Sequence, residues 1–234
     1  MAYSKAALVG LDGSGKSAKI RLMKTDTDFS DYRFVWVRWK PILLWPAYRL
    51  MNGRVKKQSA SEDHQPQEQR QAGADYQAKS GMKKRIFRYP FIRGIWMALA
   101  LTDYFFQFYW KTGKLLLSGK KIVFDRFYLD LFVDQGINFG YSPEKIGRCI
   151  RRWQWLFPTM DATIYLRVAP EICFQRKDDI PSMDYLLKRY DIYEYLSRES
   201  GWLCVDGEGP LNEVYADIKR HLTAGGEARI VETK

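Results

Sequence analysis

The sequence is poor in the residues that build disulfide scaffolds and common metal sites. It has three cysteines and two histidines in 234 residues, and the cysteines, at positions 149, 173 and 204, are far apart. No pair has the short spacing of a zinc site, and widely spaced thiols are typical of a reducing compartment. The apolar surroundings of Cys173 and Cys204 predict that both thiols are buried.

Long hydrophobic runs are also lacking. The most hydrophobic stretch, 94–102, lies between Arg93 and Asp103, and about 20 apolar residues are needed to cross a bilayer. The apolar run at the amino terminus leads into a glycine-rich loop and not into a signal-peptide cleavage site. We therefore expect a cytoplasmic protein, and peripheral association with a membrane stays open.

Acidic residues are scarce relative to basic ones. The chain has 27 Asp and Glu against 38 Lys and Arg, a net charge of +11. Such an excess suits phosphorylated small molecules, an anionic membrane surface or nucleic acid as partners. No DNA- or RNA-binding motif accompanies the charge, so nucleic acid is the weakest of the three alternatives.

A complete phosphate-binding motif is present near the amino terminus. It fills every fixed position of the pattern G-x-x-x-x-G-K-[ST] and reads Gly10-Leu11-Asp12-Gly13-Ser14-Gly15-Lys16-Ser17. A strand-length apolar run precedes it and an amphipathic stretch follows it. Glycines let successive backbone amides point at phosphate oxygens, and the following helix adds its positive end. We expect Lys16 to reach the β- and γ-phosphates of a nucleoside triphosphate and Ser17 to bind Mg²⁺.

Apolar runs and amphipathic stretches alternate along the rest of the chain. Strands are expected at 33–38, 120–125, 162–167 and 202–205, and helices at 95–117, 143–156, 170–176, 185–196 and 212–222. This alternation predicts an α/β fold whose parallel sheet is covered on both faces, with ligands at the carboxyl ends of the strands. We expect a single domain over 1–222, a flexible polar insert at about 58–81 and a frayed tail over 223–234.

A second chemical landmark lies at the end of the strand expected at 120–125. Asp125 and Arg126 directly follow the apolar residues 122–124. At the end of a parallel strand, the carboxylate would lie beside the phosphate loop, where it could bind Mg²⁺ or accept a proton from the attacking group. Arg126 could bind an acceptor phosphate or transition-state charge. The alternative is a structural Asp–Arg pair that caps the strand.

Several segments together resemble the thymidylate kinase family. They are the phosphate loop with aspartate at its third position, Asp125-Arg126-Phe127, Gln135-Gly136, Val168-Ala169-Pro170-Glu171 with Arg176, and Val205-Asp206-Gly207 with Asn212-Glu213-Val214. The resemblance is good over 5–25, moderate over 120–222 and weak over 38–94. It implies a three-layer P-loop kinase fold with a five-stranded parallel sheet, ATP with Mg²⁺ as donor, and phosphoryl transfer to an acceptor held opposite.

The resemblance also implies roles for single residues. It places Lys16 and Ser17 at the triphosphate and the metal, and it makes Asp12 and Asp125 candidates for organising the metal and the acceptor. Arg126 becomes a candidate for binding the acceptor phosphate. The donor half of the site matches the family pattern.

Such enzymes place a catalytic arginine either in the phosphate loop or in the lid. The loop position here is Ser14, so the lid region, 176–189, would have to supply the positive charge. Arg176 is the first choice, and the other candidates are Lys177, Lys188 and Arg189. The alternative to a catalytic role, for each of these residues, is a solvated charge on a helix face.

The acceptor half departs from the family pattern. In the family, an aromatic residue stacks on thymine and an arginine binds the acceptor, and these two positions fall near Ala100 and Tyr104 here. Trp39-Lys40-Pro41 replaces the Glu-Pro-Gly-Gly that the family has after its second strand. A kinase for a small, phosphate-bearing acceptor other than thymidine monophosphate is therefore the leading hypothesis, and a true thymidylate kinase with a divergent pocket is an alternative. The candidate acceptor ligands are Arg38, Tyr104, Arg126 and Gln135.

Two basic and aromatic segments, 33–57 and 83–114, lie where the acceptor would enter. The first has seven basic residues and no acidic one. One interpretation is a lipid- or glycan-linked acceptor at an anionic membrane surface, with Trp39, Trp45 and Trp96 at the interface. Another is a non-catalytic, nucleotide-dependent membrane-binding protein. In the plain alternative the aromatics are core and the charges are solvated. A homodimer also stays open.

Overall fold

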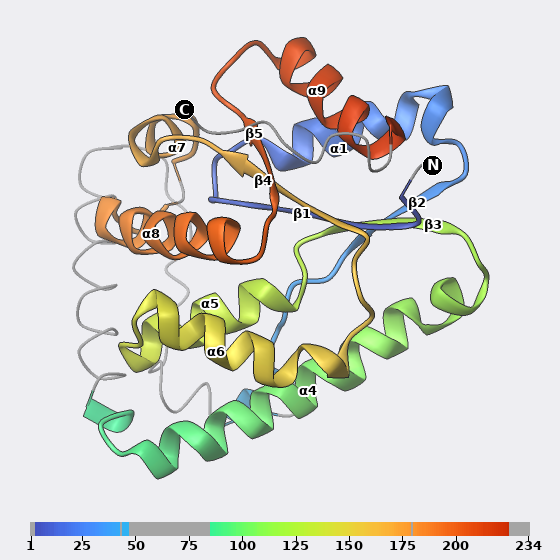
Figure 1. The fold of residues 1–234 in the computed structure, drawn as a ribbon. Helices are drawn as coiled ribbons and strands as arrows, with labels where there is room; N and C mark the ends of the chain where they lie inside the picture. Colours follow the sequence, from blue (N-terminus) through green and yellow to red (C-terminus); the bar gives the residue numbers. More distant parts are fainter. Residues whose placement is uncertain (1–2, 43, 47–84, 179, 225–234) are drawn as a thin grey trace, which may run out of the picture.

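The computed structural model describes residues 3–42, 44–46, 85–178 and 180–224. Its centre is a five-stranded sheet in the order β2-β3-β1-β4-β5, in which every neighbouring pair is parallel (Figure 1). The strands are β1 (Lys5–Gly10), β2 (Tyr32–Trp36), β3 (Lys121–Asp125), β4 (Ala162–Arg167) and β5 (Leu203–Asp206). The predicted α/β class and the five-stranded parallel sheet are thereby confirmed.

Helices cover both faces of this sheet and complete three layers. They are α1 (Lys16–Thr25), α4 (Pro90–Leu117), α5 (Tyr128–Phe139), α6 (Pro143–Trp153), α7 (Pro170–Arg176), α8 (Met183–Glu199) and α9 (Leu211–Ala224), with 3₁₀ turns at Thr27–Phe29 and Gln154–Leu156. In Figure 1, α1 and α9 lie above the sheet, whereas α4, α5 and α6 lie below it. Helix α8 packs against α5, α6 and α7.

Local sequence signals explain several of the element bounds. The side chain of Ser142 accepts a hydrogen bond from the Lys145 amide at the start of α6, and Pro143 occupies the first turn. Helix α4 begins at Pro90, five residues before its predicted start at position 95, with proline again in the first turn. Strand β4 and helix α7 have the predicted bounds.

Helix α5 was not predicted from the sequence. Most of its residues are buried, including Leu129, Leu131, Phe132 and Val133, which face different sides of the helix. A helix that is covered on most sides has no single apolar stripe, so the 3.6-residue period that identifies surface helices is missing. Its position matters for the site because it directly follows Arg126.

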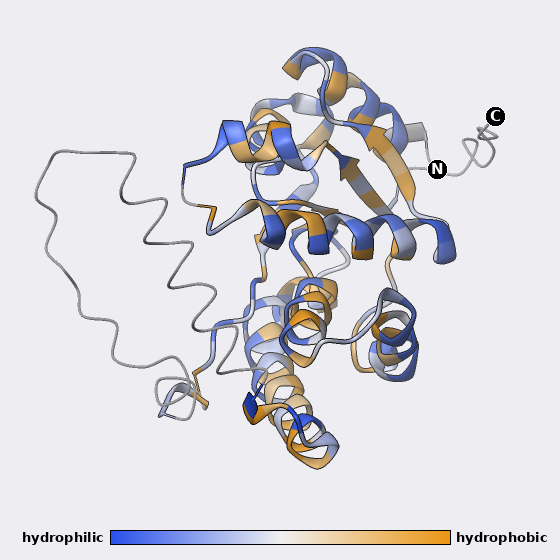
Figure 2. Ribbon diagram, turned by 90° about the vertical axis from the view of Figure 1, so that its left-hand side faces the viewer, coloured by the Kyte–Doolittle hydropathy of each residue, from blue (hydrophilic) through white to orange (hydrophobic). Residues whose placement is uncertain are grey.

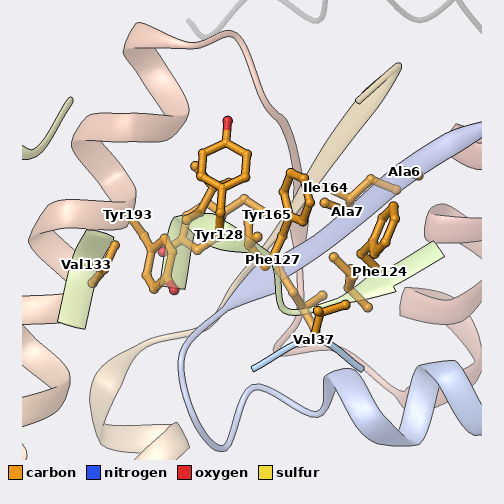
Figure 3. Close-up of a cluster of buried hydrophobic side chains, with 14 of the residues drawn as sticks. Ala6, Ala7, Val37, Phe124, Phe127, Tyr128, Val133, Ile164, Tyr165 and Tyr193 are labelled. Atoms are coloured by element: carbon orange, nitrogen blue, oxygen red, sulfur yellow. The ribbon is translucent and has the colours of Figure 1, made fainter. Parts of the chain in front are cut away.

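The core lies between the sheet and the helices on both sides. Figure 3 shows side chains of β1, β3 and β4 (Ala6, Ala7, Phe124, Ile164) and of α5 and α8 (Val133, Tyr193) in one buried cluster. The rings of Tyr128 and Phe157 stack with centroids 4.7 Å apart. The strands read as continuous apolar runs because a parallel sheet is buried on both faces.

Some predictions about burial are corrected by the structure. Cys173 is buried as predicted, but Cys204 is exposed because it lies on the edge strand β5. Trp96 is buried and Trp39 packs against the core, whereas about half of the Trp45 surface is exposed. Trp96 is therefore a core residue and is not available to a membrane interface.

The predicted insert at 58–81 lies outside the described residues, as do 225–234 of the expected tail. Thr223 and Ala224, which were predicted to be frayed, form the last residues of α9. Within the described ranges, no helix has the length and apolar character needed to cross a bilayer.

Candidate functional site

The phosphate-binding motif forms the turn between β1 and α1. Gly10, Gly13 and Gly15 all have positive φ angles, of 152°, 90° and 83°. A Cβ on Gly13 would lie 2.4 Å from the backbone oxygen of Cys173, and one on Gly10 would lie 2.8 Å from that of Leu166. Only glycine fits at these two places because the loop passes directly over β4 and α7. The turn leads into the amino-terminal end of α1, where backbone amides and the helix dipole favour an anion.

The ammonium group of Lys16 is turned back over this loop. Its Nζ donates hydrogen bonds to the backbone oxygens of Gly10 at 2.8 Å and Leu11 at 2.6 Å, and to Ser14 Oγ at 3.1 Å. Only 5% of Lys16 is exposed. Burial, together with the charge of Arg126, lowers the pKa of the Lys16 ammonium to about 8. These bonded oxygens are neutral, so the glycine loop holds a cation whose chemistry fits a phosphate group.

Asp125 lies next to this loop, as its position at the end of a strand predicted. Its partner across the sheet is Leu8 of β1, two residues before the motif begins. Burial raises the pKa of the Asp125 carboxyl, and the nearby charges of Lys16 and Arg126 partly oppose that rise. Ser17 is exposed in the first turn of α1. Ser17 Oγ and the Asp125 carboxylate are the oxygens that would hold Mg²⁺, which prefers one or two protein ligands beside phosphate oxygens and water.

Arg126 has an unusual backbone conformation that turns its side chain into the site. Its φ angle is 65°, the only positive φ of a non-glycine residue in the part of the chain that the structure describes. This conformation costs about 1 kcal/mol or more, so the surrounding contacts must hold it. The guanidinium pairs with Asp12 of the phosphate loop and with Asp130 of α5, the latter at 3.1 Å.

These pairings set the ionisation of the groups involved. Burial alone would lower the pKa of Arg126, but Asp130 and Asp12 raise it above its ordinary value. Burial alone would likewise raise the pKa of Asp12, but Arg126, Arg189 and Lys16 hold it well below the usual range. Asp12 and Arg126 therefore stay charged and connect the phosphate loop to the end of β3.

Helix α8 adds two tyrosines that the sequence did not indicate, and it positions Arg189, one of the expected lid cations. Tyr185 Oη donates a hydrogen bond to Asp12 Oδ2 at 2.9 Å, and Tyr193 Oη donates one to Asp130 Oδ1 at the same distance. Arg189 is buried, pairs with Asp134 of α5 and lies 4.6 Å from the centre of the Tyr185 ring. The four-residue spacing of Arg126, Asp130 and Asp134 is the sequence signal that could have indicated this cluster.

Arg176, the first choice for a lid cation, has other partners. Its Nη1 donates to the backbone oxygen of Gly207 at 3.2 Å and its Nη2 to that of Glu208 at 3.3 Å. Its charge helps to lower the pKa of Lys19, after burial. Of the lid cations, Arg189 is the one that the structure brings to the Asp12–Arg126 pair, since its charge contributes to the low pKa of Asp12.

The candidate acceptor ligands fall into two groups. Arg38 lies close enough to Tyr185 for its charge to oppose the rise in the pKa of that phenol, so Arg38 and Arg126 border the same region. Tyr104 is buried and donates its hydroxyl to the backbone oxygen of Val37 at 3.1 Å. Gln135 is also buried, and its Oε1 accepts a hydrogen bond from Trp96 Nε1 at 2.9 Å.

The segment after β2 is fastened to α4 by a carboxylate. Asp103 Oδ2 accepts hydrogen bonds from Trp39 Nε1 at 3.2 Å and from the amide of Ile42 at 3.0 Å. Gln107 Nε2 donates to the backbone oxygen of Lys40 at 2.7 Å. These contacts occupy the place where the family resemblance expects Glu-Pro-Gly-Gly, and they fix the position of the neighbouring Arg38.

No protein-family model matches this chain. A search of curated proteins also found no match. The assignment of a function therefore depends on the residues of the site and on their geometry.

Proposed function

We propose that the protein is an ATP-dependent kinase that transfers the γ-phosphoryl group to a small, phosphate-bearing acceptor. The observation that carries this proposal is the approach of Lys16 and Asp125, which are far apart in the sequence, at the carboxyl ends of β1 and β3. A cation inside a glycine loop beside a carboxylate is the arrangement that phosphoryl transfer requires.

The donor half of the reaction depends on the loop and on Lys16. ATP with Mg²⁺, when bound, would supply the phosphoryl group that is transferred. The amides of the loop and of the first turn of α1 would bind phosphate oxygens. Lys16 Nζ would exchange the oxygens of Gly10, Leu11 and Ser14 for those of the phosphate chain. Ser17 would hold the metal ion directly, and Asp125 would hold it through a water molecule, which would leave the carboxylate able to accept a proton.

The acceptor half depends on Asp125 and on the arginines. Burial raises the pKa of Asp125, which makes its carboxylate a better acceptor for the proton of the attacking oxygen. Arg126 and Arg38 border the same side of the site and would bind the phosphate that the acceptor already carries. Arg189 would contribute positive charge from α8.

The surroundings of α4 support an acceptor other than thymidine monophosphate. Ala100 and Tyr104, at the two positions where the family places its base-binding residues, are both buried in the core. The Tyr104 hydroxyl is bound to the backbone oxygen of Val37. Neither residue offers an aromatic face on which a thymine ring would stack.

The test is an acceptor screen with Mg²⁺ and ATP, in which mass spectrometry detects the gain of a phosphoryl group. The panel contains nucleoside monophosphates, sugar phosphates and lipid- or glycan-linked phosphates. We expect one class to be phosphorylated, and we expect Lys16→Ala to abolish the product. The control is Arg21→Ala, an exposed cation of the same helix. ATP binding without transfer to any member of the panel would contradict the kinase assignment and favour a non-catalytic nucleotide-binding protein.

A further inference from the structure

One side of α4 carries large apolar side chains that face away from the protein. Six of them recur at intervals of four or seven residues along the helix, and together we call them the outer ridge: Phe91, Ile95, Leu99, Phe106, Trp110 and Leu117. Trp110 is 91% exposed and Leu117 is 90% exposed. Thr102 and Gly113, which lie between them on the same side, are uncharged.

The opposite side of the same helix is buried. Ala100, Tyr104 and Phe108 face the core from that side, so α4 is apolar on both sides. A helix with this pattern is normally covered on both sides, and an exposed apolar surface of this length marks a site of association. The helix has 28 residues, so the ridge extends about 40 Å. In Figures 1 and 2, no described helix or strand covers its outer side.

Basic side chains border the ridge on the side of α6. The two helices are neighbours there, because Arg93, Gly94 and Ala98 of α4 share one cavity of about 180 Å³ with Cys149 and Trp153 of α6. The hydroxyl of Tyr109 also donates to the backbone oxygen of Leu156, just after α6, at 3.0 Å. Three exposed cations of α6 do not lie on its α8 side, namely Lys145, Arg148 and Arg152.

Cations also border the ridge on its other side. The ammonium groups of Lys40 and Lys111 lie 5.2 and 5.7 Å from the centre of the Trp36 ring. Lys114 is exposed one turn further along α4. The only acidic residue between positions 85 and 121 is Asp103, which is buried and bound by Trp39 and Ile42. The whole surface is therefore apolar along its centre and positive along both borders.

We propose that the outer ridge of α4, with its bordering cations, docks on an anionic lipid bilayer. Apolar and aromatic side chains would enter the interface between headgroups and acyl chains, and Lys and Arg would meet the anionic headgroups. Because the opposite side of α4 packs against the core, the helix would lie in the plane of the interface. The proposal does not depend on catalysis.

Charge favours a bilayer over a second copy of the chain. The protein has a net charge of +11. Two copies that joined their ridges would place rows of cations near one another, with one exposed carboxylate, Glu144, on α6 to offset them. An anionic bilayer instead offers opposite charge along both borders of the ridge.

The test is vesicle flotation with the full chain at low and high salt. Vesicles of phosphatidylcholine alone are compared with vesicles that also contain phosphatidylglycerol. We expect binding to the anionic vesicles only, and we expect it to weaken as salt screens the bordering cations. Equal binding to both vesicles, or no binding to either, would overturn the proposal.

Two sets of variants locate the contact. Trp110→Asp is expected to lower the partition coefficient at least tenfold, whereas Leu211→Asp, at an exposed position of α9 on the other side of the sheet, is expected to leave it unchanged. The triple variant Lys145→Gln, Arg148→Gln, Arg152→Gln is expected to lose roughly a hundredfold at low salt. Its matched control removes three cations elsewhere: Arg21→Gln, Arg198→Gln and Arg220→Gln.

The folded state of each variant is checked by circular dichroism, and its oligomeric state by analytical ultracentrifugation. Because the substituted side chains are exposed, we expect all variants to retain the melting temperature of the parent protein. Wild-type binding that Trp110→Asp leaves unchanged would overturn the proposal. A dimer that Trp110→Asp dissociates, without any binding to vesicles, would overturn it as well and assign the ridge to a second copy.

Discussion

The hydroxyl of Tyr185 donates a hydrogen bond to Asp12 across 173 positions of sequence, at 2.9 Å. The other carboxylate oxygen of Asp12 pairs with Arg126. Helix α8 and the end of β3 are thus both connected to the phosphate loop through Asp12. A displacement of α8 would therefore change the environment of the loop directly.

Replacing Tyr185 with phenylalanine tests this connection. The variant removes a hydrogen bond to a buried carboxylate, so we expect the free energy of unfolding to fall by about 1–2 kcal/mol. Urea denaturation measures the change. The control is Tyr195→Phe, a half-buried tyrosine of the same helix, which we expect to be near neutral. Equal effects of the two substitutions would contradict a special contribution of the Tyr185–Asp12 contact.

The affinity for ATP is expected to depend on pH through Lys16. The folded-state pKa of this ammonium is about 8 because burial lowers it. Below that pH the group is charged and binds phosphate. Above it the free protein must take up a proton on binding, so affinity falls by roughly tenfold per pH unit. Isothermal titration calorimetry in two buffers of different ionisation enthalpy measures the proton uptake. The variant Lys16→Arg stays charged and should lose this pH dependence between pH 7 and about 9.

Two glycines give opposite predictions for the same substitution. Gly13→Ala forces a Cβ against the backbone oxygen of Cys173 at a φ of 90°, so we expect a loss of about 2 kcal/mol or more in unfolding free energy. A Cβ on Gly113, inside α4, would meet no atom within 4 Å. Gly113→Ala should therefore gain about 0.5–1 kcal/mol through helix propensity. Thermal and urea denaturation measure both, and a stabilising Gly13→Ala would contradict the described loop.

Two of the three thiols, Cys173 and Cys204, are expected to react at different rates. Cys204 is exposed, whereas Cys173 is buried and its pKa is raised to about 11 by burial. Because the thiolate is the reactive form, a maleimide at pH 7 should modify Cys204 first and leave Cys173 intact in the folded protein. Mass spectrometry of tryptic peptides identifies the modified residues. Early labelling of Cys173 would show that α7 does not cover the loop as described.

Helices and strands with a clear period were predictable, and those without one were not. Strand β4 and helix α7 have their predicted bounds because an apolar run and a proline in the first turn delimit them. Helix α5 is buried on most sides, so its sequence shows no amphipathic stripe. The start of α4 at Pro90 was missed because residues 90–94 lack the apolar density of the following turns.

The site residues also divide into those that the sequence could place and those that it could not. Asp125 could be placed beside the phosphate loop because the carboxyl ends of parallel strands meet at one edge. Tyr185 could not be assigned, and Arg189 was one of four candidate lid cations, since only the packing of α8 against α5 brings these two side chains to Asp12 and Asp134. Tyr104 lies near the position where the resemblance expects an acceptor-binding arginine, and Gln135 belongs to one of the resembling segments. The side chains of both residues are buried and bonded to other parts of the protein.

The sequence by itself determined the glycine loop, the alternation of strands and helices, and the residue that ends the strand β3. These features depend on neighbours within a few positions, where backbone geometry and apolar periodicity act. The tertiary structure decided which charges meet, which aromatics are core and which side of α4 is exposed. Those outcomes depend on contacts between segments many residues apart, as the Tyr185–Asp12 hydrogen bond shows.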